Sequence, residues 1–267
     1  MKTLFIIIIL VFCQAWGGKT ETVEIFSPAM NKNIPALIVI PDSYGDKNDS
    51  LPVILLLHGN GGDYKNWSSK TDLGQRADEY NFIIVCPDGS RNSWYMDSPL
   101  DSSSQYETFI INELIPWINK NFRLNQMGIT GLSMGGHGAL YLAIQHPKIF
   151  DAVSSMSGGV DLTFSTVKWE ITKMLGSFEL FPDRWQSNSI VNMVETIPEE
   201  FIPILIDCGY DDFFIEINRT LHHRMIEKNI PHIYMEKPGG HSWNYWVNAL
   251  DEHLRFFENA FYEIKKD

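Results

Sequence analysis

The residue of this sequence best suited to chemistry is a serine that lies between two glycines. Gly131-Leu132-Ser133-Met134-Gly135 fits the pattern G-x-S-x-G, in which the serine sits on a sharp turn between a strand and a helix with its hydroxyl exposed. The flanking glycines carry no Cβ atom, so the strand has room to fold back against the helix. An apolar stretch, MGIT, precedes the motif and a helix-forming stretch, HGALYLAIQ, follows it. We therefore predict that Ser133 is a nucleophile.

The base that this serine needs is predicted to be His241. A serine hydroxyl is a weak nucleophile until an imidazole takes its proton, and in folds with this motif the histidine comes last in the chain, after the acid. Of the eight histidines in the sequence, only His241 follows the last predicted strand in a glycine-rich loop, KPGGHSW. From such a loop the side chain can reach back to the edge of the sheet.

The carboxylate that orients the histidine is expected in an acidic run late in the chain. Asp207-Cys208-Gly209-Tyr210-Asp211-Asp212 offers three aspartates. Asp207 lies within or beside a strand, so we expect its side chain to bind local backbone. Asp211 and Asp212 are adjacent and cannot point the same way, and we prefer Asp212 as the acid and expect Asp211 to be solvated. The predicted catalytic triad is Ser133, Asp212 and His241.

Two backbone N–H groups are predicted to stabilise the negative charge that develops on the attacked oxygen. Such an oxyanion hole takes one N–H from the residue after the nucleophile, here Met134, and one from the loop after the third strand. That loop is His58-Gly59-Asn60-Gly61-Gly62, and Asn60 is the predicted second donor. The glycines also fit a tight turn that needs a positive φ, and the two interpretations are compatible.

The elements that must position these residues alternate between short apolar runs and helical patterns. This alternation is typical of a largely parallel sheet with helices on both faces. Segments 22–26 and 36–40 are expected to form a leading hairpin. The other predicted strands are 53–57, 82–86, 128–131, 152–156, 204–206 and 233–235, which makes about eight in all.

Helices are predicted over 106–122, 135–145 and 243–262. The first carries a broad apolar stripe despite Pro116. Residues 159–200 have no clean period but contain five large aromatic side chains. They form either an insertion over the edge of the active site or a plain helical connection with a packed aromatic core.

The N-terminal sequence, MKTLFIIIILVFCQAWGGKT, is typical of a secretory signal. Its apolar run of about ten residues is shorter than the roughly 20 that span a membrane, so no permanent membrane anchor is expected. A lipid anchor on Cys13 is disfavoured because the bulky Phe12 precedes it. We predict a signal peptide over 1–17, a single catalytic domain over 18–267, and a secreted or periplasmic protein.

Charge and cysteine usage exclude several classes of function. The formal net charge is −12, which repels phosphate backbones, so nucleic acid is not an expected partner. Cys86 and Cys208 would lie four strands apart, too far for a disulfide, and are predicted to be buried thiols. No metal site is predicted, because neighbours on a helix such as His222 and His223 point about 100° apart and rarely share one ion.

The motifs together make the chain similar to the esterase D family of α/β-hydrolases, which includes feruloyl and acetylxylan esterases, S-formylglutathione hydrolases and mycobacterial mycolyltransferases. The resemblance runs from about Thr22 to the C-terminus. It implies the α/β-hydrolase fold and places the family's acid at Asp212. The pieces that carry it are LLLHGNGG, NSWYMDS, YETFIINELIPWI, GLSMGGHGAL, CGYDDFF and GGHSWNYW.

The resemblance also implies positions for residues near the substrate. Trp94, Tyr95 and Asp97 would lie in the loop after the fourth strand, near an acyl or sugar pocket, and the alternative is that they only pack this loop. Glu107 is expected to cap or brace its helix rather than to contact substrate.

The function implied is that of a secreted serine carboxylesterase that needs no cofactor. By analogy with the family, its substrate would be an acetyl or feruloyl ester on a carbohydrate. Export argues against an S-formylglutathione hydrolase, whose thioester substrate belongs to the cytosol. The alternatives are an acyltransferase, an esterase for small esters of the tributyrin type, and, from another class, a non-catalytic glycan-binding module.

Overall fold

The computed structural model describes residues 18–45, 50–198 and 200–264. The predicted signal segment 1–17 and its Cys13 lie outside these residues. Within the described part, no helix has both the length and the apolar character needed to cross a membrane.

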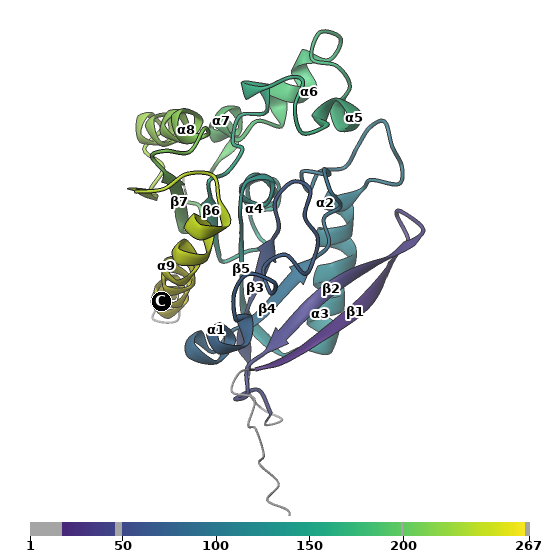
Figure 1. Cartoon of the computed structure of the whole chain (residues 1–267), viewed down its shortest axis with the longest axis vertical. Helices are drawn as coiled ribbons and strands as arrows, with labels where there is room; N and C mark the ends of the chain where they lie inside the picture. Colours follow the sequence, from purple (N-terminus) through teal and green to yellow (C-terminus); the bar gives the residue numbers. More distant parts are fainter. Residues whose placement is uncertain (1–17, 46–49, 199, 265–267) are drawn as a thin grey trace, which may run out of the picture.

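Eight strands form one sheet in the order β1-β2-β4-β3-β5-β6-β7-β8 (Figure 1). The pairs β1/β2 and β2/β4 are antiparallel, and all the others are parallel. The prediction of a leading hairpin and about eight mostly parallel strands is confirmed. The strands are β1 Lys19–Ser27, β2 Lys32–Ile40, β3 Leu51–Leu57, β4 Ile83–Pro87, β5 Leu124–Gly131, β6 Ala152–Met156, β7 Ile204–Gly209 and β8 Ile233–Lys237.

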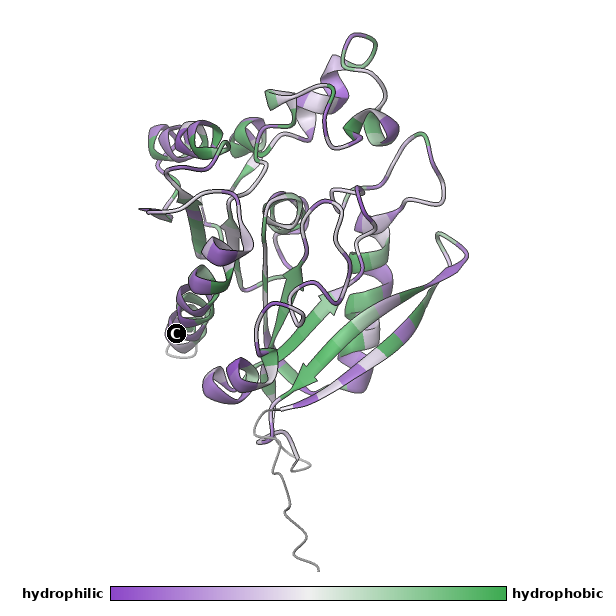
Figure 2. Ribbon diagram, viewed as in Figure 1, coloured by the Kyte–Doolittle hydropathy of each residue, from purple (hydrophilic) through white to green (hydrophobic). Residues whose placement is uncertain are grey.

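Helices cover both faces of the sheet, as predicted (Figure 1). One apolar cluster packs α1 and α9 against one face, and the larger cluster packs α2, α3, α4 and α8 against the other. The central strands are green along most of their length in Figure 2, as strands buried on both faces must be. The helices of these two layers are α1 Leu73–Tyr80, α2 Tyr106–Thr108, α3 Ile115–Asn121, α4 Met134–Gln145, α8 Ile215–Glu227 and α9 Trp243–Ile264.

The predicted helix over 106–122 is helical throughout but changes its winding. A π-helical stretch, Phe109–Leu114, joins α2 to α3. Pro116 lies at the start of α3, where a proline ring would clash with the carbonyl four residues earlier in a regular α-helix. That carbonyl belongs to Asn112, within the wider π-helical turns, so a change of winding accommodates the proline.

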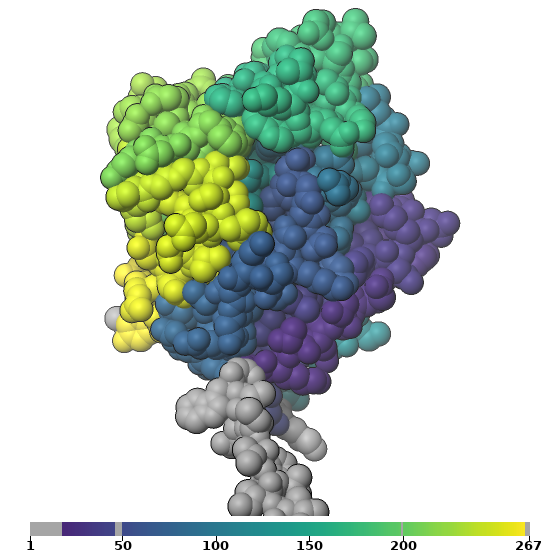
Figure 3. All heavy atoms as spheres, in the orientation of Figure 1, coloured from purple at the N-terminus to yellow at the C-terminus, as the bar shows by residue number. Residues whose placement is uncertain are grey.

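Residues 159–200 fold into short helical pieces at the end of the molecule opposite α1 (Figure 3). Trp185 is fully buried among them and donates its indole N–H to the carbonyl of Gly176 at 3.0 Å. The segment is therefore a helical connection with a packed aromatic core, and its first part also reaches the catalytic edge of the sheet, as shown below. The pieces are Leu162–Phe164, α5 Ile171–Leu175, α6 Pro182–Ser187, α7 Ile190–Met193 and Val194–Thr196.

Cys86 and Cys208 are buried and unbonded, as predicted. Cys86 lies on β4 and Cys208 on β7, four strands apart in the sheet. Burial raises the pKa of both thiols, so neither is a ready nucleophile.

His137 of α4 makes stability depend on pH. Its buried ring stacks on Tyr141, Nε2 lies 2.9 Å from the carbonyl of Asn188, and burial lowers its pKa to about 4. The unfolded chain, with a His pKa near 6.5, binds more protons between these values, so the free energy of unfolding falls as pH falls from about 6.5 to 4.

Replacing His137 with Phe should therefore reduce the stability lost between pH 6.5 and pH 4 by about 3 kcal/mol. Urea unfolding at pH 7, 5.5 and 4 measures this change, and the exposed His223→Phe serves as the control. An unaltered pH dependence in His137→Phe would show that this ring is not the group responsible.

Candidate active site

The segments that carry the candidate nucleophile and the predicted oxyanion loop leave the sheet side by side at its carboxyl edge. Gly131, the last residue of β5, pairs with Leu57, the last residue of β3. Because these strands are parallel, the segments that follow them leave the sheet at the same point. His58 and Ser133 thus come together although 75 residues separate them in the chain.

Ser133 occupies a strained turn between β5 and α4. Its backbone has φ 54° and ψ −114°, a conformation that non-glycine residues rarely adopt. Its N–H donates to the carbonyl of Met156 at 2.9 Å, which holds the turn in place. A Cβ atom on Gly131 would lie 2.7 Å from the backbone of Gly135, and one on Gly135 would lie 2.6 Å from the carbonyl oxygen of His58. Both glycines are therefore required by close backbone packing.

The three predicted triad residues form one chain of hydrogen bonds. His241 Nε2 lies 2.9 Å from Ser133 Oγ, and His241 Nδ1 lies 2.8 Å and 3.0 Å from the two carboxylate oxygens of Asp212. With Nδ1 protonated, the ring donates to Asp212 and accepts from the Ser133 hydroxyl. This arrangement lets the imidazole take the serine proton while the carboxylate stabilises the resulting positive charge.

Asp212 is held in place by its own turn, whereas its neighbour faces solvent. The Asp212 side chain is buried and accepts the backbone N–H of Phe214 at 2.8 Å. Asp211 is exposed. The structure thus brings together with His241 the aspartate that the sequence favoured, and it leaves the other one solvated, as expected.

Asp207 does not bind local backbone, and the prediction for it was wrong. Its fully buried carboxylate accepts the hydroxyl of Tyr245 and lies 3.3 Å from Lys237 Nζ and 3.4 Å from His253 Nε2. Sequence reasoning missed these partners because Tyr245 and His253 lie on α9, far along the chain. Asp207 ties β7 to the first turns of α9, directly after the loop that carries His241.

A second serine, histidine and aspartate also lie in line, but inside the core. His253 Nδ1 lies 2.8 Å from Ser154 Oγ, and its Nε2 faces Asp207. All three side chains have no solvent-accessible surface. Substrate cannot reach them, so this arrangement is structural.

Three aromatic rings that the sequence analysis did not single out surround His241. Its ring centroid lies 4.3 Å from that of Phe213, 4.9 Å from Trp246 and 5.2 Å from Phe214. These rings shield the imidazole and fix its orientation. The signal that could have revealed them is their position within five residues of Asp212 or His241, in CGYDDFF and GGHSWNYW.

Phe213 also belongs to a cluster of stacked rings, Phe164, Trp169 and Phe213, which we call the aromatic shelf. Trp169 stacks with Phe213 at 6.1 Å and with Phe164 at 6.2 Å, with ring planes 16° and 26° from parallel. Phe164 is 42% exposed and Phe213 49% exposed. Two of the three residues come from the 159–200 segment, so this segment borders the site beside His241.

The predicted oxyanion donors lie next to the nucleophile with their N–H groups unused. Within the described residues, the backbone N–H groups of Asn60 and Met134 donate to no protein acceptor. The loop passes close to the serine, since a Cβ atom placed on Gly59 would lie 3.5 Å from Ser133 Cβ. Free N–H groups at this place are what an oxyanion hole requires.

Trp94, Tyr95 and Asp97 pack the loop after β4, which is the alternative that the sequence left open for them. Tyr95 has no exposed surface, and its hydroxyl contacts both the N–H and the carbonyl of His58, at 3.0 Å and 3.2 Å. Trp94 is also buried, and Asp97 accepts the N–H and hydroxyl of Thr108 at 3.0 Å and 2.6 Å. Tyr95 braces the oxyanion loop from below, so its effect on the site is indirect.

Glu107 braces its helix, as expected. Its carboxylate accepts the hydroxyl of Tyr141 at 2.7 Å and lies 2.8 Å from His146 Nε2. Both partners belong to the end of α4 or the residue after it, so Glu107 fixes α2 against the helix that follows the nucleophile.

The described residues contain no group of three or more His, Cys, Asp or Glu side chains that could hold a metal ion. His222 pairs with His232, at 2.7 Å between Nδ1 and Nε2, and its ring stacks on Tyr234. His222 lies on α8 and His232 directly before β8, apart from the Ser133 turn.

Comparison with known proteins places these features in a family context. The family described as "Putative esterase" matches residues 27–257. The chain is 25% identical to an acetyl esterase from Caldicellulosiruptor saccharolyticus, over 91% of this chain and 97% of that protein, and 24% identical to an S-formylglutathione hydrolase from Bos taurus, over 91% and 94%. A solved ferulic acid esterase is 28% identical, covers 91% of this chain and 99% of its own, and superposes with a TM-score of 0.79.

Proposed function

Since the chain belongs to the "Putative esterase" family and is a carboxylic ester hydrolase, we propose that it cleaves acyl esters with Ser133, His241 and Asp212 as its triad. The resemblance to the esterase D family is confirmed. The observation that carries the proposal is the unbroken hydrogen-bond chain from Ser133 Oγ through His241 to Asp212.

In the proposed reaction, His241 first acts as a general base and then as a general acid. It takes the hydroxyl proton as Ser133 Oγ bonds to the ester carbonyl carbon, and the N–H groups of Asn60 and Met134 stabilise the oxyanion. His241 then gives the proton to the departing alcohol, which leaves an acyl group on Ser133. His241 next takes a proton from water as the water oxygen bonds to the acyl carbon, and it returns that proton to Ser133 Oγ as the bond between Oγ and the acyl carbon breaks and the carboxylic acid leaves.

We further propose that the substrate is an acylated carbohydrate outside the cell, with an acetyl or feruloyl group as the acyl part. The apolar N-terminal segment supports export. The aromatic shelf beside His241 offers stacked rings to a planar phenolic group or to the C–H face of a sugar. Relatives named acetyl esterase and ferulic acid esterase are consistent with both acyl types.

Turnover of methyl ferulate, acetylated xylan and tributyrin tests this substrate class. We expect the highest kcat/KM on methyl ferulate or on acetylated xylan, with Ser133→Ala as the blank for spontaneous hydrolysis. A clear preference for tributyrin would instead identify an esterase for small or lipid esters and would overturn the carbohydrate proposal.

A further inference from the structure

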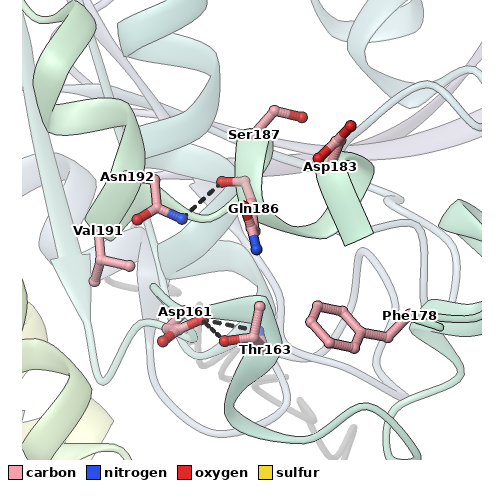
Figure 4. Close-up of a pocket in the computed structure, with 8 residues that line it drawn as sticks. All are labelled: Asp161, Thr163, Phe178, Asp183, Gln186, Ser187, Val191 and Asn192. Carbon is pink, nitrogen blue, oxygen red and sulfur yellow. Dashed lines mark hydrogen bonds between the residues drawn. The ribbon is translucent and has the colours of Figure 1, made fainter. Parts of the chain in front are cut away.

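An open surface pocket of about 650 Å³, called the cavity below, lies within the 159–200 segment (Figure 4). It is formed between the turn around Leu162–Phe164 and the helices α6 and α7. Its size falls within the range of small-molecule binding sites in proteins. The lining side chains used below are Asp161, Thr163, Phe178, Asp183, Gln186 and Asn192.

Several polar groups of this cavity are available to a ligand. Within the described ranges, the Gln186 side-chain amide and the Asp183 carboxylate have no hydrogen-bond partner. Figure 4 shows the Gln186 amide directed toward Asp161 and Thr163. One Asp161 oxygen accepts the N–H and hydroxyl of Thr163, at 2.9 Å and 2.7 Å, which leaves the other oxygen free.

Other lining groups are already engaged in contacts within the protein. Asn192 donates to the carbonyl of Gln186 at 2.9 Å and accepts from Arg224 at 2.8 Å. The Phe178 ring is held edge-on by the buried Trp185, with centroids 6.0 Å apart and planes at 88°. The cavity therefore presents one free amide, free carboxylate oxygens and an aromatic ring.

This combination of groups suits a neutral compound that is rich in hydroxyl groups. Amide and carboxylate oxygens accept hydrogen bonds from hydroxyls, the amide NH₂ donates to them, and an aromatic ring packs against the C–H face of a sugar. Two carboxylates in a protein of net charge −12 repel anions such as phosphates and uronic acids. Two carboxylates are also fewer ligands than a metal site needs.

The cavity begins close to the candidate nucleophile. The N–H of Gly159 donates to the carbonyl of Ser133 at 3.2 Å, and Asp161 follows two residues later. At about 3.8 Å per residue, the Asp161 Cα lies within roughly 8 Å of the Gly159 Cα. On the other side, Thr163 of the cavity precedes Phe164 of the aromatic shelf.

The aromatic shelf connects the cavity to the base. Phe164 lies 6.4 Å from Phe213, and Phe213 lies 4.3 Å from His241, measured between ring centroids. A row of rings therefore leads from Phe164, the neighbour of Thr163 in the chain, through Phe213 to His241.

We propose that this cavity is a subsite for the neutral carbohydrate part of the ester, at least one sugar unit away from the bond that is cleaved. The inference rests on the proposed function, because it assigns the alcohol portion of the same substrate to a second binding site. Small esters cannot reach the cavity and the triad together, and they should not sense changes in the cavity.

The double variant Asp183→Ala/Gln186→Ala tests the subsite. We expect KM for a partially acetylated oligosaccharide of xylose, mannose or glucose to rise about tenfold, as the loss of two hydrogen bonds implies. KM and kcat for p-nitrophenyl acetate should stay within about twofold of wild type. Gln75→Ala is the matched control, since Gln75 is exposed on α1 at the opposite end of the molecule.

A second variant, Ser187→Trp, fills the cavity from the exposed end of α6 and should have the same selective effect. Unchanged KM values on all three oligosaccharides in both variants would overturn the subsite, and so would an equal rise on p-nitrophenyl acetate. Failure of the proposed function is distinguishable, because the wild-type protein would then not hydrolyse the oligosaccharides, whether or not it hydrolysed p-nitrophenyl acetate.

Discussion

Replacing Ser133 with alanine is expected to lower kcat for p-nitrophenyl acetate by at least about 10⁴-fold. The variant lacks the Ser133 oxygen that bonds to the acyl group. Water would then have to attack the ester directly, in a site that positions the serine hydroxyl and not a water molecule. Only stabilisation by the oxyanion N–H groups would remain. Alanine would adopt the same strained backbone conformation as Ser133, so the substitution should not greatly alter the stability of the protein.

Initial rates of p-nitrophenol release measure this loss, and Ser102→Ala in an exposed loop is the control. A fluorophosphonate probe should label wild type and the control but not Ser133→Ala. Adding His241→Ala to Ser133→Ala should lower the rate little further, because residues that act as one unit are not additive. Activity in Ser133→Ala within tenfold of wild type would mean that another residue is the nucleophile.

Replacing Asp212 with asparagine is expected to lower kcat by about 10⁴-fold while leaving KM nearly unchanged. The amide has almost the same shape as the carboxylate, but it carries no charge to stabilise the imidazolium. Its NH₂ group can also donate to His241 Nδ1, which would place the ring proton on Nε2 and remove the acceptor for the Ser133 hydroxyl.

The matched control is Asp211→Asn, one residue earlier in the same turn. It removes the same charge from an exposed side chain that does not contact His241, so its kcat should stay within about twofold of wild type. If instead Asp211→Asn lost most of its activity and Asp212→Asn kept it, the acid would be Asp211. The hydrogen bonds of 2.8 Å and 3.0 Å between His241 Nδ1 and the Asp212 carboxylate would then not be functional.

Local patterns in the sequence were enough to predict most of the fold. The apolar runs and the intervening helical stripes predicted the mostly parallel sheet with helices on both faces, since both depend on periodicity within a segment. They did not predict the π-helical winding before Pro116, because the sequence pattern of a π-turn is the same as that of an α-helix. They also left open the form of 159–200, where the pieces are too short to show a period.

The surroundings of the triad were less predictable than the triad itself. Asp207 was expected to bind local backbone but contacts Tyr245 and His253, whose positions depend on how α9 packs across the sheet. For Tyr95 the sequence left open a position near substrate or a packing role, and the residue lies beneath the oxyanion loop. In each case the partner of the residue lay too far away in the chain to be recognised from the sequence.

By itself, the sequence determined the candidate nucleophile, base and oxyanion loop, because each belongs to a short motif whose geometry is set by neighbouring residues, with glycines where the backbones must touch. The sequence favoured Asp212 over Asp211 as the acid, and the tertiary structure shows it facing His241. The tertiary structure alone decided which aromatic rings shield His241, and that Phe164, Trp169 and Phe213 meet as a shelf beside a polar cavity. Asp212 and Phe213 reach His241 from 29 and 28 residues away in the chain, and Trp169 meets Phe213 across 44 residues. These contacts follow from the packing of loops at one edge of the sheet.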